Sequence, residues 1–490
     1  MNVLIFIQSG KIPFFTSLAN LFKKKNFKVT FSVNNNINYR NLLFFLKKVG
    51  DNFPIIIEQN FKKKKINILK QAKIYEKKYK FNFSYLMSFE RGIGRGYLSN
   101  VDNYPEIVRA NWNYEKKLEY ILYEFMYLEN TIKTKKTNFI LSLVPNPAIY
   151  IIAKFYKIKY FSLAYSKLGE RFIWSDNSYP DNLKLIKSVK TKDNYKQKSV
   201  SDIKNIIKKN SSTYAHSVNK YGFFQNFKIL VFYIFLEFYR IIRNTKKKNS
   251  YYFLSNLSRI ISRPYIYRKI LKDGLCFDQI KKMKYIYVPL HLEPEMALQN
   301  FSPEFNNQYE MISWISKSLP SDYHVIIKEH PEMYGLRTLN YLNKLMQIPN
   351  LSIAKPNINS LDLITKSQAV ATITGTAAFE AIYLEKPVLS FGLHQIINFL
   401  SSVHYCSNFK ETQNGIEKIL NGITVNTLRV NSKKLINSIY NNSFELNDLD
   451  KIDDAFDTVK RSLDNKFKDI EKWKKLSKIA FNNLLPMLKK

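Results

Sequence analysis

Residues 328–335 read KEHPEMYG, and residues 359–392 read NSLDLITKSQAVATITGTAAFEAIYLEKPVLSFG. Three short apolar runs lie in or beside this stretch, at Tyr323–Ile327, Ala369–Ile373 and Pro387–Phe391. Their shortness and their content of Val, Ile and Phe are typical of buried parallel strands. The stretch therefore predicts a doubly wound α/β domain, in which helices alternate with the strands of a parallel sheet.

Small residues follow the second of these runs, where the sequence reads Thr374-Gly375-Thr376. At the mouth of a helix such residues leave backbone N–H groups pointing outward, and the helix dipole adds to their attraction for an anion. Lys328 and His330 end the preceding strand, so in a parallel sheet they should reach the same carboxyl edge. A cation, an imidazole and a helix N-terminus at one edge predict a pocket for a phosphorylated ligand.

Four motifs in this part of the chain resemble a known family. They are His330-Pro331, TGTAAFEA at 374–381, KPVLSFG at 386–392 and PLHLEPEMAL at 289–298. Together they resemble the donor half of GT-B-type capsular polysaccharide biosynthesis proteins, a group that includes bacterial transferases of 3-deoxy-D-manno-oct-2-ulosonic acid (Kdo). The resemblance covers roughly residues 285–395. It implies an α/β, GT-B-like fold of two doubly wound Rossmann-type domains facing a cleft.

The resemblance also implies roles for single residues. In the family the pair His330-Pro331 contacts the nucleotide and phosphate of the donor, whereas the plainer interpretation of His330 is a core or capping histidine. Glu380 would accept hydrogen bonds from the ribose hydroxyls, and its plainer interpretation is a solvated carboxylate on a helix. His291 and Glu295 follow a strand at the same sheet edge, so both are further candidates for the pocket.

Composition limits the classes of protein that fit. The 490 residues suffice for two or three domains, and 45% of them are hydrophobic. The net charge of +38 favours an acidic substrate or an anionic membrane, although abundant Lys, Asn, Ile, Tyr and Phe also reflect AT-rich codons. No nucleic-acid-binding motif accompanies the charge, so we expect no nucleic-acid partner.

Two cysteines, Cys276 and Cys406, provide neither a disulfide framework nor a metal quartet, which fits a reducing compartment. The N-terminal MNVLIFIQSGKIPFF has no basic region before its apolar run and no small-residue cleavage site. It predicts a first strand and not a signal peptide. We therefore expect a cytoplasmic protein that lies on the inner face of the cytoplasmic membrane if it meets a membrane at all.

The order of the predicted elements divides the chain into four parts. An N-terminal acceptor-side α/β domain is expected at 1–184, a helical and basic insertion at 185–283, and a nucleotide-sugar-binding α/β domain at 284–429. The polar helical tail at 430–490 packs back on the first domain in GT-B folds, so the resemblance implies the same here. The predicted strands of the first domain are Asn2–Ile7, Lys28–Val33, Pro54–Ile57, Phe139–Leu143 and Tyr160–Ala164.

One loop of the N-terminal half, residues 89–97, reads FERGIGRGY. Glycines at alternate positions free its backbone, and Arg91 and Arg95 can hold carboxylates or phosphates bidentately. Sugar transfer needs a general base for the acceptor hydroxyl, and Glu90 on this loop is the first candidate, with Asp102 second. The alternative is a surface loop without a role.

One further acidic pattern could indicate a metal-binding site. The triplet Asp448-Leu449-Asp450 is the only Asp-x-Asp in the chain. It lies in an acidic tail segment and is interpreted as helix capping and surface charge. We therefore expect transfer without a metal or another cofactor, with basic groups and a helix dipole stabilising the leaving phosphate.

The insertion contains one apolar block, Phe227–Ile242, followed by Arg243 and Lys246–Lys248. The block is shorter than the roughly 20 residues that span a bilayer, and Glu237 interrupts it. It predicts either a helix lying in the interface of an anionic membrane or a buried core helix. The mixture of apolar and basic residues in Leu254–Leu271 favours the interface.

Taken together, these patterns predict a glycosyltransferase of bacterial surface or capsular polysaccharide assembly. Its donor would be a nucleotide sugar, with CMP-Kdo as the first candidate, and its acceptor a glycan or glycolipid. Two alternatives stay open. One is a UDP-sugar 2-epimerase of the same fold, which needs no acceptor and no interfacial helix. The other is a non-catalytic component that binds or exports polysaccharide.

Overall fold

The chain divides into two compact units, which are described separately. The first consists of Met1–Leu86, Leu118–Ser188 and Ser438–Lys490, and the second of Met87–Lys117 and Val189–Asn437. The computed structural model describes residues 1–7, 11–34, 36–58, 61, 66–90, 93, 112–191, 227–228, 230–232, 234–235, 253–293, 295–447, 449 and 470–489.

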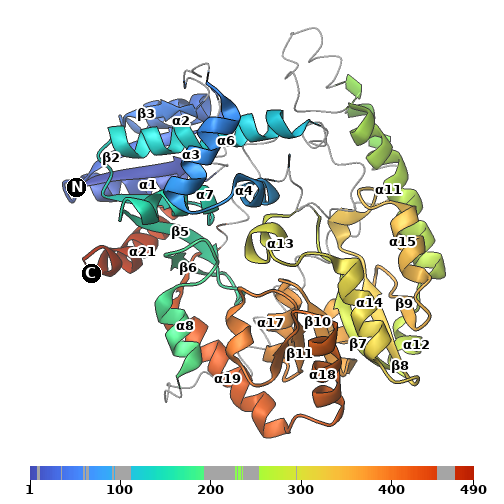
Figure 1. Ribbon diagram of the computed structural model, residues 1–490. Coiled ribbons are helices and arrows are strands. Elements are labelled where there is room, and N and C mark those ends of the chain that lie inside the picture. Colours follow the sequence, from blue (N-terminus) through green and yellow to red (C-terminus); the bar gives the residue numbers. More distant parts are fainter. Residues whose placement is uncertain are drawn as a thin grey trace. The chain divides into compact units, whose positions relative to one another are not determined.

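The first unit is built on a seven-stranded sheet with the order β13-β6-β5-β4-β1-β2-β3 (Figure 1). Strands β1 to β5 run parallel, whereas β6 is antiparallel to β5 and β13 is antiparallel to β6. β1 reads NVLIFI and is almost wholly buried, as is typical of a central parallel strand. The strands are β1 (Asn2–Ile7), β2 (Lys28–Val33), β3 (Ile55–Ile57), β4 (Phe139–Ser142), β5 (Lys159–Tyr165), β6 (Arg171–Ser175) and β13 (Phe444–Glu445).

Helices follow most of these strands in the chain. Asn146 caps α7 by accepting a hydrogen bond from the Ile149 amide, and Pro147 occupies the first helical position, where its missing N–H has no cost. The helices are α1 (Ile12–Lys23), α2 (Asn36–Val49), α3 (Ile68–Tyr79), α4 (Phe83–Phe89), α6 (Tyr114–Thr134), α7 (Pro147–Phe155), α8 (Leu183–Lys190) and α21 (Ile470–Lys489).

The C-terminal helix α21 is part of the core of the first unit and lies along α1 (Figure 1). The Trp174 indole Nε1 donates to the Ala480 carbonyl at 2.8 Å, and the Ser477 hydroxyl donates to the Phe14 carbonyl at 2.8 Å. The Phe22 and Phe481 rings meet edge to face at 4.9 Å. Loss of the last 20 residues would therefore expose the apolar side of α1.

A buried carboxylate joins α3, α6 and α7. Glu129 accepts hydrogen bonds from the Tyr75 hydroxyl at 2.7 Å, the Tyr156 hydroxyl at 2.6 Å and the Lys78 ammonium at 2.6 Å. Burial alone would raise the pKa of Glu129, but these donors outweigh burial and hold the pKa far below its usual range. Three helices are thus tied together by one ionised side chain.

The second unit contains a six-stranded sheet with the order β12-β11-β10-β7-β8-β9, and all its strands are parallel. Numbered from its own first strand, this is the Rossmann order 3-2-1-4-5-6. The order reverses between β7 and β10, and ligands of such sheets bind outside the carboxyl ends of the strands at that point. The strands are β7 (Lys284–Pro289), β8 (Tyr323–Lys328), β9 (Leu351–Ile353), β10 (Ala369–Thr372), β11 (Val388–Ser390) and β12 (Val403–Tyr405).

Two faces of this sheet are covered differently. Ile286 and Val288 of β7 join the main apolar core of the unit, whereas Tyr285, directly before them, donates its hydroxyl to the Leu363 carbonyl of α16 on the other face. The helices are α11 (Phe253–Asp273), α12 (Phe277–Ile280), α13 (Met296–Phe301), α14 (Gln308–Ser318), α15 (Leu339–Met346), α16 (Ser360–Lys366), α17 (Thr376–Tyr383), α18 (Phe409–Leu420) and α19 (Val425–Asn442), with short 3-10 turns η3 (Pro331–Met333) and η4 (Ile396–Phe399).

The predicted α/β class with two doubly wound domains is confirmed. The predicted strands agree with the structure to within a residue or so at each end, whereas β6, β12 and β13 were not predicted. Strands of two or three residues, such as β13 and β12, are too short to show a hydrophobic period in the sequence. They form because they pair with strands that are distant in the sequence. That the two domains face a cleft stays a prediction.

The division into units differs from the predicted boundaries in one respect. Residues 87–117 are counted with the second unit, although the sequence places them in an N-terminal domain at 1–184. Residues 438–490 are counted with the first unit, and they include most of the predicted tail. Among the described residues, no helix is long and apolar enough to cross a membrane.

Candidate functional site

His291 stands at the point where the strand order of the second unit reverses. It follows β7, and its Nε2 atom lies 2.9 Å from the Thr372 hydroxyl and accepts the Ile373 amide N–H at 3.2 Å, both at the end of β10. Because Nε2 accepts that N–H, the neutral ring carries its proton on Nδ1. Because Nε2 carries no proton, the Thr372 hydroxyl donates to it, and the same hydroxyl accepts the Gly375 amide N–H at 3.0 Å.

Gly375 leads directly from this contact into α17. A Cβ atom at Gly375 would lie 2.6 Å from the Thr372 hydroxyl and 3.2 Å from Cε1 of His291, so the turn has no room for a side chain. The Thr374 side chain is buried and that of Thr376 is exposed. The N-terminus of α17, which has no side-chain cap, thus begins beside the His291 ring, where its dipole favours an anion.

His330 follows β8, the strand next to β7 in the sheet. Its Nδ1 atom accepts the Glu332 amide at 3.2 Å, which caps the short turn η3 that begins at Pro331. Burial lowers the pKa of His330 to about 4, so the imidazole is neutral near pH 7. With Nδ1 as acceptor, the neutral ring carries its proton on Nε2 and can donate from that atom.

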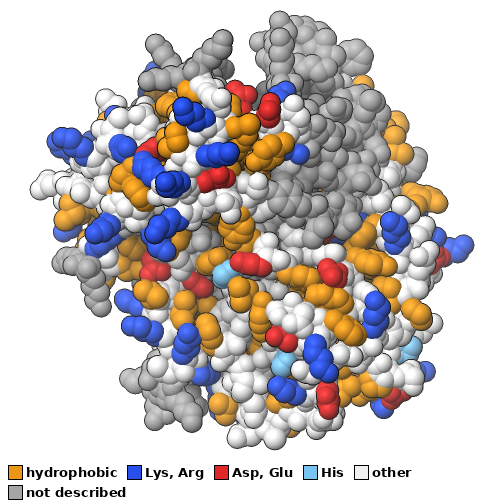
Figure 2. All heavy atoms as spheres, viewed as in Figure 1, with side chains coloured by type: hydrophobic (Ala, Val, Ile, Leu, Met, Phe, Trp, Pro, Cys, Tyr) orange, Lys and Arg blue, Asp and Glu red, His pale blue; other side chains and the backbone are white. Residues whose placement is uncertain are grey.

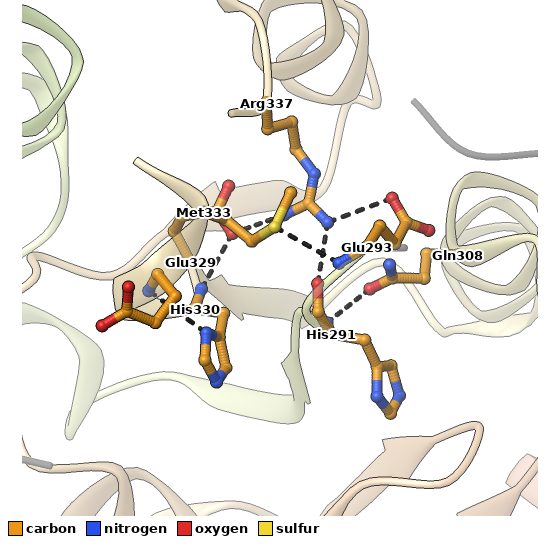
Figure 3. Close-up of polar contacts among 8 residues, drawn as sticks. His291, Glu293, Gln308, Glu329, His330, Met333 and Arg337 are labelled. Carbon is orange, nitrogen blue, oxygen red and sulfur yellow. Dashed lines mark hydrogen bonds and ion pairs between the residues drawn. The ribbon is translucent and has the colours of Figure 1, made fainter. Parts of the chain in front are cut away.

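One arginine connects the two histidine loops, and Figure 3 shows its contacts. The fully buried Arg337 donates to the Glu329 carboxylate, to Glu293 at 3.2 Å and to the His291 carbonyl at 2.9 Å. The Glu329 carboxylate also accepts the His330 amide at 2.8 Å. In Figure 3 the rings of His291 and His330 point to the same side, away from Arg337.

Both Arg337 and Glu329 have shifted pKa values in this network. Burial lowers the pKa of Arg337, but the carboxylates of Glu329 and Glu293 outweigh it, and the net pKa lies above the ordinary value. Arg337 is therefore always charged. Burial raises the pKa of Glu329 against the opposing effect of Arg337. Burial, with a smaller contribution from the charge of Glu293, is therefore why Glu329 holds a proton more readily than an exposed glutamate does.

Lys328 does not join the histidines. Successive strand residues point to opposite faces, so Lys328 reaches the face opposite Glu329. Its ammonium donates to the Ile358 carbonyl and, at 3.2 Å, to the Ser360 hydroxyl at the start of α16. Burial lowers its pKa to about 8. In this structure the lysine holds the loop before α16, and its direct contact with a phosphate stays a prediction.

Glu380 lies on α17, one turn beyond Thr376. Burial raises the pKa of its carboxyl to about 7, although the side chain keeps some exposed surface. The charge of Glu380 in turn helps to raise the pKa of Tyr287, whose main cause is burial. A carboxyl that titrates near neutrality is a common feature of functional sites.

The other predicted site residues divide into two groups. Glu295 is the N-cap residue of α13, beyond the His291 loop, and is partly buried. Glu90 directly follows α4, is partly buried and is counted with the second unit. Arg91, Arg95 and Asp102 lie outside the described residues, as do Asp448 and Asp450.

Two Rossmann-type α/β domains in one chain, with small residues and a histidine at the switch point of the second, make up a GT-B-like fold. Residues 228–396 match the model of a family described as capsule polysaccharide biosynthesis protein. The family resemblance of the four sequence motifs, all of which lie in this segment, is therefore confirmed. No curated protein sequence matches the chain.

Solved structures with low sequence identity are similar to the chain. A UDP-GlcNAc 2-epimerase from Methanocaldococcus jannaschii is 12% identical, with 86% of this chain and 93% of that chain covered and a TM-score of 0.24. A beta Kdo 2,7 transferase from Thermosulfurimonas dismutans is 13% identical, with 63% and 80% covered and a TM-score of 0.30. A UDP-GlcNAc 2-epimerase from Neisseria meningitidis is 13% identical, with 90% and 98% covered and a TM-score of 0.28. At these scores the fold assignment rests on the strand orders themselves.

The sequence analysis missed the residues that orient the site. Arg337 lies in a turn, Tyr334–Arg337, that carries no motif, and Thr372 was read only as part of a strand. A signal was nonetheless present, because Glu293 and Glu329 follow two neighbouring strands. Two carboxylates expected at one sheet edge require a cation nearby, and the only arginine between 300 and 400 is Arg337.

The first prediction concerns the Arg337 network. Arg337→Met leaves Glu293 and Glu329 buried without a counter-ion, so the free energy of unfolding should fall by about 3–5 kcal/mol. Because protonation relieves that repulsion, the deficit should shrink as the pH falls toward about 5. Urea denaturation at both pH values measures it.

Arg429→Met is the matched control, since the Arg429 side chain is 56% exposed and its contact with Glu385 is long at 3.7 Å. It should change the stability by less than about 0.5 kcal/mol. Equal urea midpoints for Arg337→Met and Arg429→Met would show that the Arg337 network does not stabilise the fold.

Proposed function

We propose that the chain is a glycosyltransferase of bacterial surface or capsular polysaccharide assembly that uses a nucleotide-sugar donor. One observation carries the proposal. The segment that matches the capsule polysaccharide biosynthesis family contains the switch point where His291, His330 and the Thr374–Thr376 turn gather around the carboxyl edge of the sheet. The donor is expected to bind there.

The chemistry of that edge suits a leaving nucleotide phosphate. The amides at the start of α17 and the Nε2 proton of neutral His330 are donors that need no rearrangement when charge develops on the phosphate. The proposal includes transfer without a metal, so a chelator should leave the rate unchanged. Glu380, one turn into α17, is the candidate for the ribose hydroxyls, and Lys328 supports the adjoining loop.

CMP-Kdo is the first donor to test, because the sequence motifs resemble those of Kdo transferases. The acceptor is proposed to be a glycan or glycolipid. The general base that deprotonates its hydroxyl is proposed to be Glu90, with Asp102 as the second choice. A UDP-sugar 2-epimerase is the alternative within the same fold class.

The second prediction tests the proposed function. Incubation with CMP-Kdo and a lipid-linked Kdo acceptor should release CMP and lengthen the acceptor, as mass spectrometry would measure. His330→Ala should lower the turnover by about 10²-fold or more, because it removes a donor to the leaving phosphate. His324→Ala, at the opposite end of the same strand, is the control and should be close to the unchanged protein.

Two outcomes decide against this assignment. Conversion of UDP-GlcNAc to its 2-epimer without any acceptor would assign the epimerase activity instead. Full turnover of a folded His330→Ala protein would remove His330 from the donor site while leaving the transferase class in place.

The third prediction concerns the base. Glu90→Gln should lower the turnover by about 10²–10⁴-fold while the affinity for the donor is retained, because only proton removal from the acceptor is lost. Asp102→Asn is made in parallel. A dead Asp102→Asn protein beside a normal Glu90→Gln protein would transfer the role to Asp102.

The fourth prediction uses the titration of Glu380. Its carboxyl, with a pKa of about 7, is protonated below that pH and then accepts hydrogen bonds only weakly. Affinity for a methyl ester of CMP, whose phosphodiester does not titrate in this range, should fall as the pH drops from about 8 to about 6. Calorimetry measures it. His330, with a pKa of about 4, stays neutral throughout this range.

Glu380→Gln should remove this pH dependence, whereas Glu385→Gln, two residues beyond α17, should keep it. A pH dependence that persists in Glu380→Gln would assign the titration to another group and leave the ribose contact without support.

A further inference from the structure

Helix α11 carries a line of exposed side chains along its outer face. Ile261, Tyr265, Arg268 and Lys272 are spaced by four, three and four residues, so they share one face of the helix. Ile261 is 58% exposed and Tyr265 is 62% exposed, and both basic residues are exposed as well. We refer to these four residues as the outer stripe. It is apolar toward the start of the helix and basic toward its end.

The inner face of α11 is firmly attached to the second unit. Ile266 and Ile270 are buried in its main core, and the rings of Tyr267 and Tyr334 meet edge to face at 5.4 Å. The Arg263 guanidinium pairs with Glu332 at 3.5 Å. The helix therefore does not need its outer stripe for packing within the unit, and the stripe is a surface of defined shape.

A second group of exposed apolar residues lies nearby in the sequence. Among the described residues between 227 and 235, five large hydrophobic side chains are at least 37% exposed. They are Phe227, Val231, Phe232, Ile234 and Phe235. So many exposed large side chains in so short a segment indicate a contact with an apolar environment. In the described part of the chain no helix can span a bilayer. These side chains would therefore enter a bilayer from one of its surfaces without crossing it.

The basic end of the stripe is electrostatically available. Within the described residues Arg268 and Lys272 form no ion pair, whereas the neighbouring Lys269 is paired with Asp273 at 2.9 Å. Figure 2 shows orange hydrophobic and blue basic side chains in the region that α11 occupies in Figure 1. An aliphatic side chain, a tyrosine and then two cations in line match the layers of a bilayer surface, from acyl chains through the interface to anionic headgroups.

We infer that the outer stripe of α11 binds the surface of an anionic lipid bilayer, with the exposed side chains of Phe227, Val231, Phe232, Ile234 and Phe235 as a second insertion point. Ile261 and Tyr265 enter the interface, and Arg268 and Lys272 contact the lipid phosphates. The net charge of +38 attracts the whole chain to such a surface, and the stripe determines the face that docks. This inference goes beyond the proposed function and does not depend on it.

The fifth prediction tests the stripe with the full-length protein and sonicated vesicles of equal parts phosphatidylglycerol and phosphatidylcholine. The double variant Arg268→Gln/Lys272→Gln should bind these vesicles about 30-fold more weakly in a sedimentation assay, since each cation near an anionic surface contributes about fivefold. Ile261→Ser/Tyr265→Ser should also weaken binding, and this loss should persist in about 1 M salt, where charge is screened.

The matched control separates the stripe from general basicity. Lys410→Gln/Lys418→Gln removes two exposed cations from α18 and should bind as the unchanged protein does. Thermal unfolding should be the same for all variants, because every altered side chain is exposed. Equal losses for the α18 and α11 charge variants, or unchanged binding of the Arg268→Gln/Lys272→Gln protein, would overturn the inference. So would equal binding to vesicles of phosphatidylcholine alone, or no binding to either kind.

Discussion

The geometry of the candidate site depends on one buried guanidinium. Arg337 has no exposed surface, and its planar fork reaches the loops after β7 and β8 together. A lysine could neutralise charge but could not bind three acceptors in fixed directions. Buried ion pairs of this kind often contribute little net stability, so the reason to keep one is orientation. Here the oriented groups are the backbones that carry His291 and His330.

The residues at the end of β8 make contacts on opposite faces of the sheet. Because side chains alternate across a strand, Glu329 turns to the Arg337 network and Lys328 turns to the start of α16 on the opposite face. His330, one residue further, leaves the strand and caps η3. Three consecutive residues thus connect two loops and one helix N-terminus to a single strand. The KEH sequence is therefore a structural junction between these elements.

The fold could be predicted from the sequence because buried parallel strands are short, apolar and bounded by turns, as β7, β8 and β10 are. The site could be predicted only in part. Carboxyl-edge placement follows from strand order, so His291 and the Thr374–Thr376 turn were expected there. The direction of each side chain could not be predicted, because the face of the sheet to which Lys328 points depends on the strand register. The role of Arg337 depends on tertiary contacts, and its one signal, the two carboxylates Glu293 and Glu329 after neighbouring strands, is distant from Arg337 in pattern and requires the strand order to be known.

Helix α11 connects the loop after β8 with the outer stripe. Its inner face contacts Glu332, which lies in the turn that His330 caps, and Tyr334, which ends that turn. Its outer face carries the stripe with Tyr265. Both faces belong to one helix fixed in the core of the second unit, so the distance from a docked bilayer to the His330 ring is set by the fold. If the acceptor is a glycolipid, its lipid is held in the same surface. An enzyme attached in this way would need to search for its acceptor only in two dimensions, and only sugars at a limited height above the headgroups would come within reach of the donor.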